Sequence, residues 1–175
     1  MSASSSNADN ADVPRVYLGI GSNVDRARNV RSALARLRGL FPDLIRSRVF
    51  DTQAIGFDGN DFYNLVVGFD TELPLPDLDA VLHAIESELG RDRETPGAGA
   101  RTIDLDILLY GDVIDRDGGR RLPREDIDRY AFVLGALAEI APRQNHPISG
   151  KTFLQLWQEL DPIERSTLRV VAGDW

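Results

Sequence analysis

The sequence predicts a single α+β domain, with an antiparallel sheet covered by helices on one side. Two observations support this fold class. Apolar residues alternate at the two-residue period of strands in some segments and recur at helical spacing in others, in the order strand, helix, strand, strand, helix, strand. The chain has 175 residues, 42% of them hydrophobic, which is enough to close one core.

The expected elements follow one another along the chain. A first apolar run ends in Gly-Ser-Asn, where the glycines permit a tight turn into a helix. Leucine, isoleucine and valine at helical spacing predict amphipathic helices, the second of them ending at Gly90. The expected strands are 16–20, 44–52, 62–71 and 101–109, and the expected helices are 27–38, 78–89, 131–140 and 152–160.

The remaining segments extend this core. Gly118-Gly119 predicts a hairpin within residues 112–122. Residues 1–13 are rich in Ser, Ala, Asn and Asp and are expected to form a disordered tail, whereas 14–160 form the domain. Residues 161–175 are a C-terminal extension with either an edge strand around 168–171 or a mobile end. This element order is that of a ferredoxin-like sandwich.

Composition argues against several classes of partner. A net charge of −8 and a pI near 4.7 would repel nucleic acid and anionic membranes. No apolar run reaches the roughly 18 to 20 residues that span a bilayer, so we expect a cytoplasmic protein. We also expect a monomer, although the sequence has no pattern that fixes the oligomeric state. Because there is no cysteine, a metal would need oxygen or histidine ligands, which favours hard cations such as Mg²⁺.

The strand expected at 101–109 carries two carboxylates. Asp104 and Asp106 are two residues apart, so they project from one face with Cα atoms about 7 Å apart. Such a pair can hold Mg²⁺ for phosphoryl transfer, although a solvated outer face is the alternative. The opposite, apolar face is predicted to consist of Ile103, Leu105, Ile107 and Leu109.

Arginines near this strand indicate phosphate. Arg101 precedes the carboxylates, and Arg91 and Arg93 begin the Pro- and Gly-containing loop before it. Guanidinium groups suit phosphate oxygens, whereas a salt-bridged surface is the alternative. No P-loop or complete dinucleotide-binding glycine motif is present. His83, three residues before Glu86 on the second helix, faces either this site or solvent.

Aromatic residues could accommodate a flat ligand. Phe62-Tyr63-Asn64 begins the third expected strand, and Phe132 follows the hairpin. Rings on both sides of a heterocycle, with an amide at its edge, would suit this task. Core packing is the alternative interpretation.

Five segments, in this order, resemble the 6-hydroxymethyl-7,8-dihydropterin pyrophosphokinase family. They are GIGSN, FYN, ESELGR, GARTIDLDILLYGD and FVLGALAEIAP, and the resemblance covers about residues 16–160. It implies a ferredoxin-like fold and transfer of pyrophosphate from MgATP to 6-hydroxymethyl-7,8-dihydropterin in folate synthesis. It also implies two Mg²⁺ ions.

The resemblance also implies roles for individual residues. Asp104 and Asp106 would hold the metal and, with Arg91 and Arg101, form the catalytic set. The ATP-binding residues would be His83, Glu86, Arg91, Arg93, Arg101 and Arg124, and the pterin-binding residues would be Thr52, Ile55, Phe62, Asn64 and Phe132.

The chain departs from the family pattern at several positions. Gly97-Ala98 replaces a usual Arg-Trp pair, and Gln53-Ala54 replaces a proline-rich start of the pterin loop. Pro123-Arg124, followed by Glu125, replaces Pro-His, and Tyr130 replaces an arginine, so Arg124 or Arg129 is a candidate for the missing phosphate contact. Two alternatives therefore stay open: a diverged relative that binds a pterin or nucleotide as a sensor, and a kinase for a related pterin.

Overall fold

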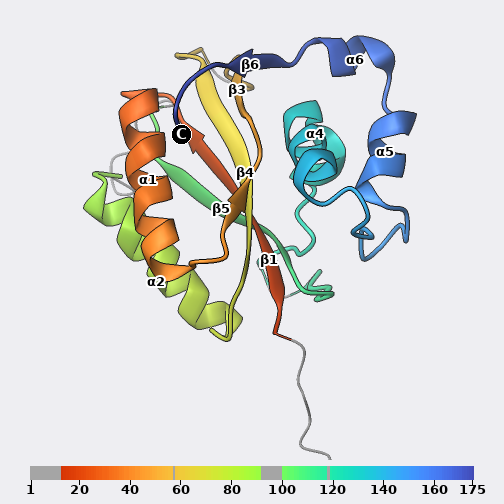
Figure 1. Ribbon diagram of the computed structural model, residues 1–175, viewed down its shortest axis with the longest axis horizontal. Helices are drawn as coiled ribbons and strands as arrows, with labels where there is room; N and C mark the ends of the chain where they lie inside the picture. Colours follow the sequence, from red (N-terminus) through yellow and green to blue (C-terminus); the bar gives the residue numbers. More distant parts are fainter. Residues whose placement is uncertain (1–12, 57, 92–99, 118) are drawn as a thin grey trace, which may run out of the picture.

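Figure 1 shows the computed structural model, in which one sheet separates two groups of helices. The structure describes residues 13–56, 58–91, 100–117 and 119–175. The strands are β1 (Arg15–Ser22), β2 (Ile45–Arg46), β3 (Val49–Thr52), β4 (Phe62–Asp70), β5 (Asp104–Tyr110) and β6 (Arg169–Val171). The helices are α1 (Arg26–Leu40), α2 (Leu75–Glu88), α3 (Asp126–Arg129), α4 (Ala131–Ile140), α5 (Phe153–Glu159) and α6 (Pro162–Ser166).

The sheet has the strand order β5-β1-β4-β3-β6, and β2 also pairs with β4. All of these pairings are antiparallel. The predicted α+β class with an antiparallel sheet is confirmed. The two longest pairings, β1 with β4 and β1 with β5, place β1 in the middle of the part of the sheet that carries the candidate site.

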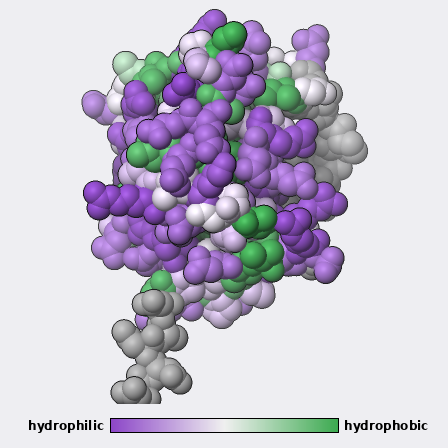
Figure 2. All heavy atoms as spheres, turned by 90° about the vertical axis from the view of Figure 1, so that its right-hand side faces the viewer, coloured by the Kyte–Doolittle hydropathy of each residue, from purple (hydrophilic) through white to green (hydrophobic). Residues whose placement is uncertain are grey.

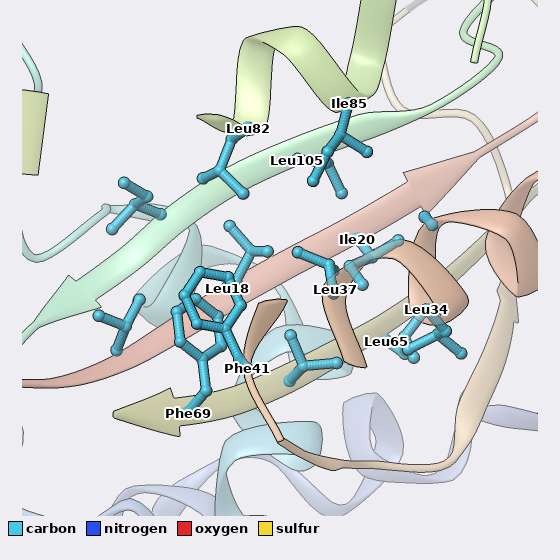
Figure 3. Packing of buried hydrophobic residues seen from close by; sticks show 14 of the residues in the cluster. Leu18, Ile20, Leu34, Leu37, Phe41, Leu65, Phe69, Leu82, Ile85 and Leu105 are labelled. Atoms are coloured by element: carbon cyan, nitrogen blue, oxygen red, sulfur yellow. The ribbon is translucent and has the colours of Figure 1, made fainter. Parts of the chain in front are cut away.

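One face of the sheet is sealed by α1 and α2. Helical spacing places Leu34 and Leu37 on one side of α1, and Phe41 follows directly after the helix on the same side. All three meet side chains from β1, β4 and β5 (Figure 3). Leu82 and Ile85 of α2 complete this cluster. The ring of Phe41 stacks on Phe69 of β4 with centroids 3.9 Å apart.

The other face is covered by α4, so the expectation of helices on one side only is wrong. Helix α4 is apolar around most of its circumference, with buried residues from Val133 to Ala138. Such a helix needs partners on more than one side. It packs on the sheet through one side and on α5 through another, and Phe153 of α5 is fully buried there. The outer face formed by α5 and α6 is mostly hydrophilic, with small separate hydrophobic patches (Figure 2).

Strand β5 departs from the predicted alternation at its end. A register shift against β1 lies between Tyr17, opposite Leu109, and Leu18, opposite Ile107. An extra residue of this kind reverses the side on which the following side chains emerge. Leu108 and Leu109 therefore both join the α4 cluster, and the assignment of Leu109 to the other face is wrong.

The expected strand at 44–52 is broken into β2 and β3. The buried hydroxyl of Ser47 accepts a hydrogen bond from the Val66 amide at 3.0 Å and donates one to the Arg48 carbonyl at 2.8 Å. A serine side chain that bonds to backbone in this way competes with the regular ladder. Helix α1 also continues through Gly39 to Leu40, two residues beyond its expected end.

The C-terminal segment forms an edge strand, one of its two expected forms. β6 pairs with β3, and beyond it Trp175 packs edge-on against Tyr63 with ring centroids 5.6 Å apart. The predicted hairpin is present as a bridge between Asp115 and Leu122, while Gly118 and the tail residues 1–12 lie outside the described residues. In the described ranges, no helix is both long enough and apolar enough to cross a membrane.

Candidate active site

A cavity of about 330 Å³ opens on the α4 face of the sheet. Its floor is formed by β1, β4 and β5, and its walls are the segment after β3, the segment before α3 and the start of α4. The residues that line the cavity include Gly19, Gly21, Thr52, Ile55, Phe62, Asn64, Arg101, Asp104, Asp106, Arg124, Asp126, Tyr130 and Phe132.

The strand register places the lining residues in rows across the sheet. Gly21 of β1 lies between Asn64 of β4 and Asp104 of β5, and Gly19 lies opposite Asp106 in the next row. A Cβ atom on Gly21 would sit only 2.9 Å from Oδ1 of Asn64. The glycine therefore leaves room between the amide and the carboxylate.

Asp104 is held by two guanidinium groups. Nη1 of Arg91 bonds to one of its carboxylate oxygens, and Nη1 of Arg101 bonds to the other. The Asp104 side chain is largely buried, whereas Arg101 is about half exposed at the mouth of the cavity. Arg101 can therefore exchange partners with a ligand at less cost than Arg91 can.

Glu86 anchors this cluster from the α2 side. It is 1% exposed, and its Oε1 accepts hydrogen bonds from Nη1 of Arg91 and, at 2.8 Å, from the amide of Leu105. Among the described strands β5 lies at the edge of the sheet, and none of them pairs with that amide on its outer side. Glu86 thus satisfies the free edge of β5 and orients Arg91 toward Asp104.

The turn after β1 delivers Arg101 to the site. Oδ1 of Asn23 accepts from the Arg101 amide at 2.6 Å, and the Asn23 amide donates to the Arg101 carbonyl at 3.0 Å. The hydroxyl of Ser22 donates to the carbonyl of Thr102 at 2.6 Å. These bonds hold Arg101 beside the Gly-Ser-Asn turn, although the two segments are far apart in the sequence.

Asp106 lies beside Arg124 without a direct hydrogen bond. Nη2 of Arg124 is 3.7 Å from Oδ1 of Asp106 and 2.9 Å from Oδ2 of Asp126. Burial, followed by the charge of Asp104, raises the pKa of Asp106 to about 6, although Arg124 opposes the shift. A bound cation would relieve this unfavourable charge.

The other end of the cavity carries rings and an amide. Phe62 and Asn64 point into it, while Tyr63 between them points to the opposite face, where Arg26 lies over its ring at 4.0 Å. Nδ2 of Asn64 donates to Oγ1 of Thr52 at 2.7 Å. Across the cavity, Phe132 stacks on Tyr130 with centroids 5.4 Å apart and planes 14° apart.

The structure brings most of the predicted site residues together. The lining includes all five predicted pterin residues and, of the predicted charged residues, Arg101, Asp104, Asp106 and Arg124. Arg91 and Glu86 stand directly behind Asp104. His83 is exposed on α2 and does not line the cavity, so its role in ATP binding stays a prediction. Arg93 and the pair Gly97-Ala98 lie outside the described residues.

The cavity is also lined by Gly19, Gly21, Asp126 and Tyr130, which had no predicted role in the site. Gly19 and Gly21 were expected to form a turn, but both lie within β1, where their missing side chains open the cavity floor. Asp126 and Tyr130 line the opposite wall. The G-x-G spacing could have indicated the floor, because residues two apart share one face of a strand.

The carboxylate pair suits a hard cation that brings most of its own ligands. Across the described residues, no group of three or more His, Cys, Asp or Glu side chains could form a complete protein cage. Mg²⁺ is commonly held by one or two carboxylates, with waters and phosphate oxygens as the remaining ligands. Asp104 and Asp106 fit this donor set.

Comparisons with known proteins find related sequences over most of the chain. The family model for 7,8-dihydro-6-hydroxymethylpterin-pyrophosphokinase (HPPK) matches residues 17–142. The 2-amino-4-hydroxy-6-hydroxymethyldihydropteridine pyrophosphokinase of Methylorubrum extorquens is 39% identical over 157 residues, covering 86% of this chain and 98% of that protein. The protein of the same name from Aquifex aeolicus is 36% identical over 146 residues, covering 82% of this chain and 91% of that protein.

A solved structure supports the fold. The crystal structure of wild-type Plasmodium falciparum HPPK-DHPS with pteroate matches with a TM-score of 0.64 at 13% identity, covering 84% of this chain and 42% of that chain. This chain thus spans less than half the length of that solved chain, and the likeness concerns the fold alone. The family model and the two relatives show that the chain belongs to the 7,8-dihydro-6-hydroxymethylpterin-pyrophosphokinase family.

Proposed function

We propose that this protein transfers the pyrophosphoryl group of ATP to 6-hydroxymethyl-7,8-dihydropterin, in folate biosynthesis. The products are the pterin diphosphate and AMP. The observation that carries the proposal is one cavity with a carboxylate and guanidinium cluster at one end and rings with an amide at the other. Family membership supplies the reaction class.

The charged end would bind the polyphosphate. Asp104 and Asp106 would hold Mg²⁺, two ions in our proposal, which would supply positive charge to neutralise the phosphate oxygens. Arg101, half exposed, can turn from Asp104 to a phosphate oxygen. Arg91 stays anchored by Glu86 and keeps a positive charge behind the transferring group.

The ring end would position the acceptor. Phe62 and Phe132 suit the two faces of a pterin ring, and the side chains of Asn64 and Thr52 suit its polar edge. The hydroxymethyl oxygen then attacks the β-phosphorus of ATP and releases its proton to solvent. The bond from that phosphorus to the bridging oxygen breaks, and AMP leaves with that oxygen. Catalysis rests on holding both reactants in line and on neutralising charge.

A product assay tests this proposal. The purified protein is incubated with MgATP and the pterin, and AMP and the pterin diphosphate are quantified by chromatography. We expect equal amounts of both, strong loss with Asp106→Asn, and no loss with Asp112→Asn, an exposed aspartate just beyond β5. No AMP above background, despite measurable pterin binding, would overturn the proposal.

We further propose a cytoplasmic monomer that acts on small molecules and has neither a nucleic acid nor a membrane partner. The net charge of −8 supports the absence of a nucleic acid partner and of a membrane partner, because it repels anionic polymers and surfaces. Sedimentation of the purified protein, with and without ATP, tests the monomer. A stable dimer at micromolar concentration would contradict it.

A further inference from the structure

Arg124 lies between two carboxylates that line the cavity, Asp106 and Asp126. Both its Nε and its Nη2 lie 2.9 Å from Oδ2 of Asp126, whereas Oδ1 of Asp106 is 3.7 Å from Nη2. Asp126 thus takes the hydrogen bonds, and Asp106 has only a longer electrostatic contact. The guanidinium stays close to Asp106 without occupying its oxygen.

The backbone fixes this arrangement. The Arg124 amide donates to the carbonyl of Leu108 at 3.0 Å, which ties the segment to the end of β5. The Ile127 amide donates to the Arg124 carbonyl at 3.2 Å, and this turn brings Asp126 beside the guanidinium. Both side chains are about one-third exposed or less and line the same cavity.

Arg129, the other candidate for a phosphate contact, is placed differently. Its guanidinium lies 5.8 Å from the centroid of the Tyr130 ring, and the residue is exposed and absent from the cavity lining. Arg124 is therefore the arginine of this segment that a ligand in the cavity would meet.

Two cations compete for Asp106. A guanidinium in full contact with its carboxylate would occupy the oxygens that a divalent cation needs, because both bind the same lone pairs. Hydrogen bonds between charged groups are short and strong, so the group that takes the Arg124 N–H donors decides where the guanidinium rests. In this chain that group is Asp126.

We propose that Asp126 is a positioning residue that holds Arg124 off the Asp106 carboxylate, which leaves Asp106 free for a divalent cation and Arg124 free for phosphate. The proposal rests on the proposed function, since it concerns the metal and phosphate of that reaction. When Asp126 is removed, Arg124 closes onto Asp106 and weakens metal binding.

A double-mutant cycle with Mn²⁺ as the probe tests this role. Free Mn²⁺ is measured by electron paramagnetic resonance in the presence of the full-length protein, without turnover. We expect Asp126→Asn to weaken Mn²⁺ binding about tenfold. Arg124→Gln should strengthen binding about tenfold in the Asp126→Asn background but only about twofold in the wild type, because only the released guanidinium competes.

The matched control is Asp128→Asn. Asp128 lies on the same helix and its replacement removes the same charge, but its side chain is 64% exposed and faces His146 instead of Arg124. We expect its effect to be small and additive with Arg124→Gln. Thermal melting of every variant confirms that each is folded before its Mn²⁺ affinity is interpreted.

Each outcome decides the proposal. Additive effects of Asp126→Asn and Arg124→Gln would show that Asp126 contributes only negative charge, and would overturn it. Absence of Mn²⁺ binding by the wild type would overturn it as well. In the activity assay, Asp126→Asn should raise the Mg²⁺ concentration needed for half-maximal rate while kcat recovers at high Mg²⁺. A wild type that binds Mn²⁺ but makes no AMP would contradict the proposed function alone.

Discussion

The two faces of the sheet are built from the same strands but differ in purpose. Toward α1 and α2, neighbouring positions of β4, β1 and β5 place Leu65, Ile20 and Leu105 in the packed core (Figure 3). One residue further along, β1 and β5 turn Gly21 and Asp106 toward α4 and the cavity. Because successive side chains point to opposite faces, one backbone serves both purposes.

The difference shows how the molecule supports a cluster of charges. On the cavity face, burial and then the charge of Asp104 disfavour the ionised form of Asp106, and its raised pKa reflects that cost. The arginines around Asp104 offset part of it. Folding is driven by the packed face, since burial of apolar side chains is the main favourable contribution. Changes on the two faces should therefore separate activity from stability.

The largest expected effect comes from the carboxylate end of the cavity. Asp104→Asn should lower kcat at least about 100-fold, because it removes a charge that neutralises metal and orients two arginines. Rates should be expressed per folded molecule, with the folded fraction taken from circular dichroism. Activity within threefold of the wild type would refute the role of Asp104. It would also show that this part of the cavity face does not determine activity.

The neighbouring residue provides the opposite case. Leu105→Ala, on the packed face, should lower the free energy of unfolding by about 2–4 kcal/mol, because it removes buried methyl groups and leaves a cavity. The kcat per folded molecule should stay within a few-fold of the wild type at low temperature. Urea unfolding measures the first quantity. A loss of turnover as large as that of Asp104→Asn, in fully folded protein, would break the distinction between the faces.

The sequence was sufficient for the facing of β5 from Asp104 to Ile107, but not for the end of this strand or for the layers around it. Alternation alone put Asp104 and Asp106 on one side of a strand, and the structure agrees. Alternation could not reveal the bulge that moves Leu109, because a register shift depends on the partner strand. Nor could it place α4, since a helix that is apolar all round points to no particular face.

Local patterns also fail where a residue's role depends on a distant partner. The positions of Arg124 and Arg129 in the sequence do not tell which one faces the cavity, because the turn at α3 decides it. Gly21 has the same limitation. A side chain at position 21 would collide with Asn64 of β4, a residue over forty positions away in the sequence.

Gly21→Ala tests the cavity floor and should have an intermediate effect. The new Cβ would lie 2.9 Å from Oδ1 of Asn64, so the amide must move and strain its bond to Thr52. We expect the KM for the pterin to rise about tenfold, about 1.4 kcal/mol, with little change in the KM for ATP. Gly39→Ala in α1 is the control, because a Cβ there meets no atom within 4 Å. Equal KM values for all three proteins would show that the pterin does not use this floor.

The smallest expected effect is the pH dependence of stability without metal. In the folded protein the pKa of Asp106 is about 6, against an ordinary value of 3.8, so between these values the folded state keeps a proton that the unfolded state releases. Stability due to this group therefore falls as pH rises from about 4 to 6, and the full penalty remains above 6. Asp106→Asn cannot ionise and escapes this penalty.

The melting temperature of Asp106→Asn, relative to the wild type in EDTA, should accordingly increase as pH rises through this window and then stay level. Asp106 is 40% exposed, so solvent screening limits the difference to a few degrees. Contributions from carboxylates far from Asp106 are common to both proteins and cancel in the difference. A difference that does not vary with pH would mean that the Asp106 charge costs nothing. The cavity face would then be no more strained than the packed one.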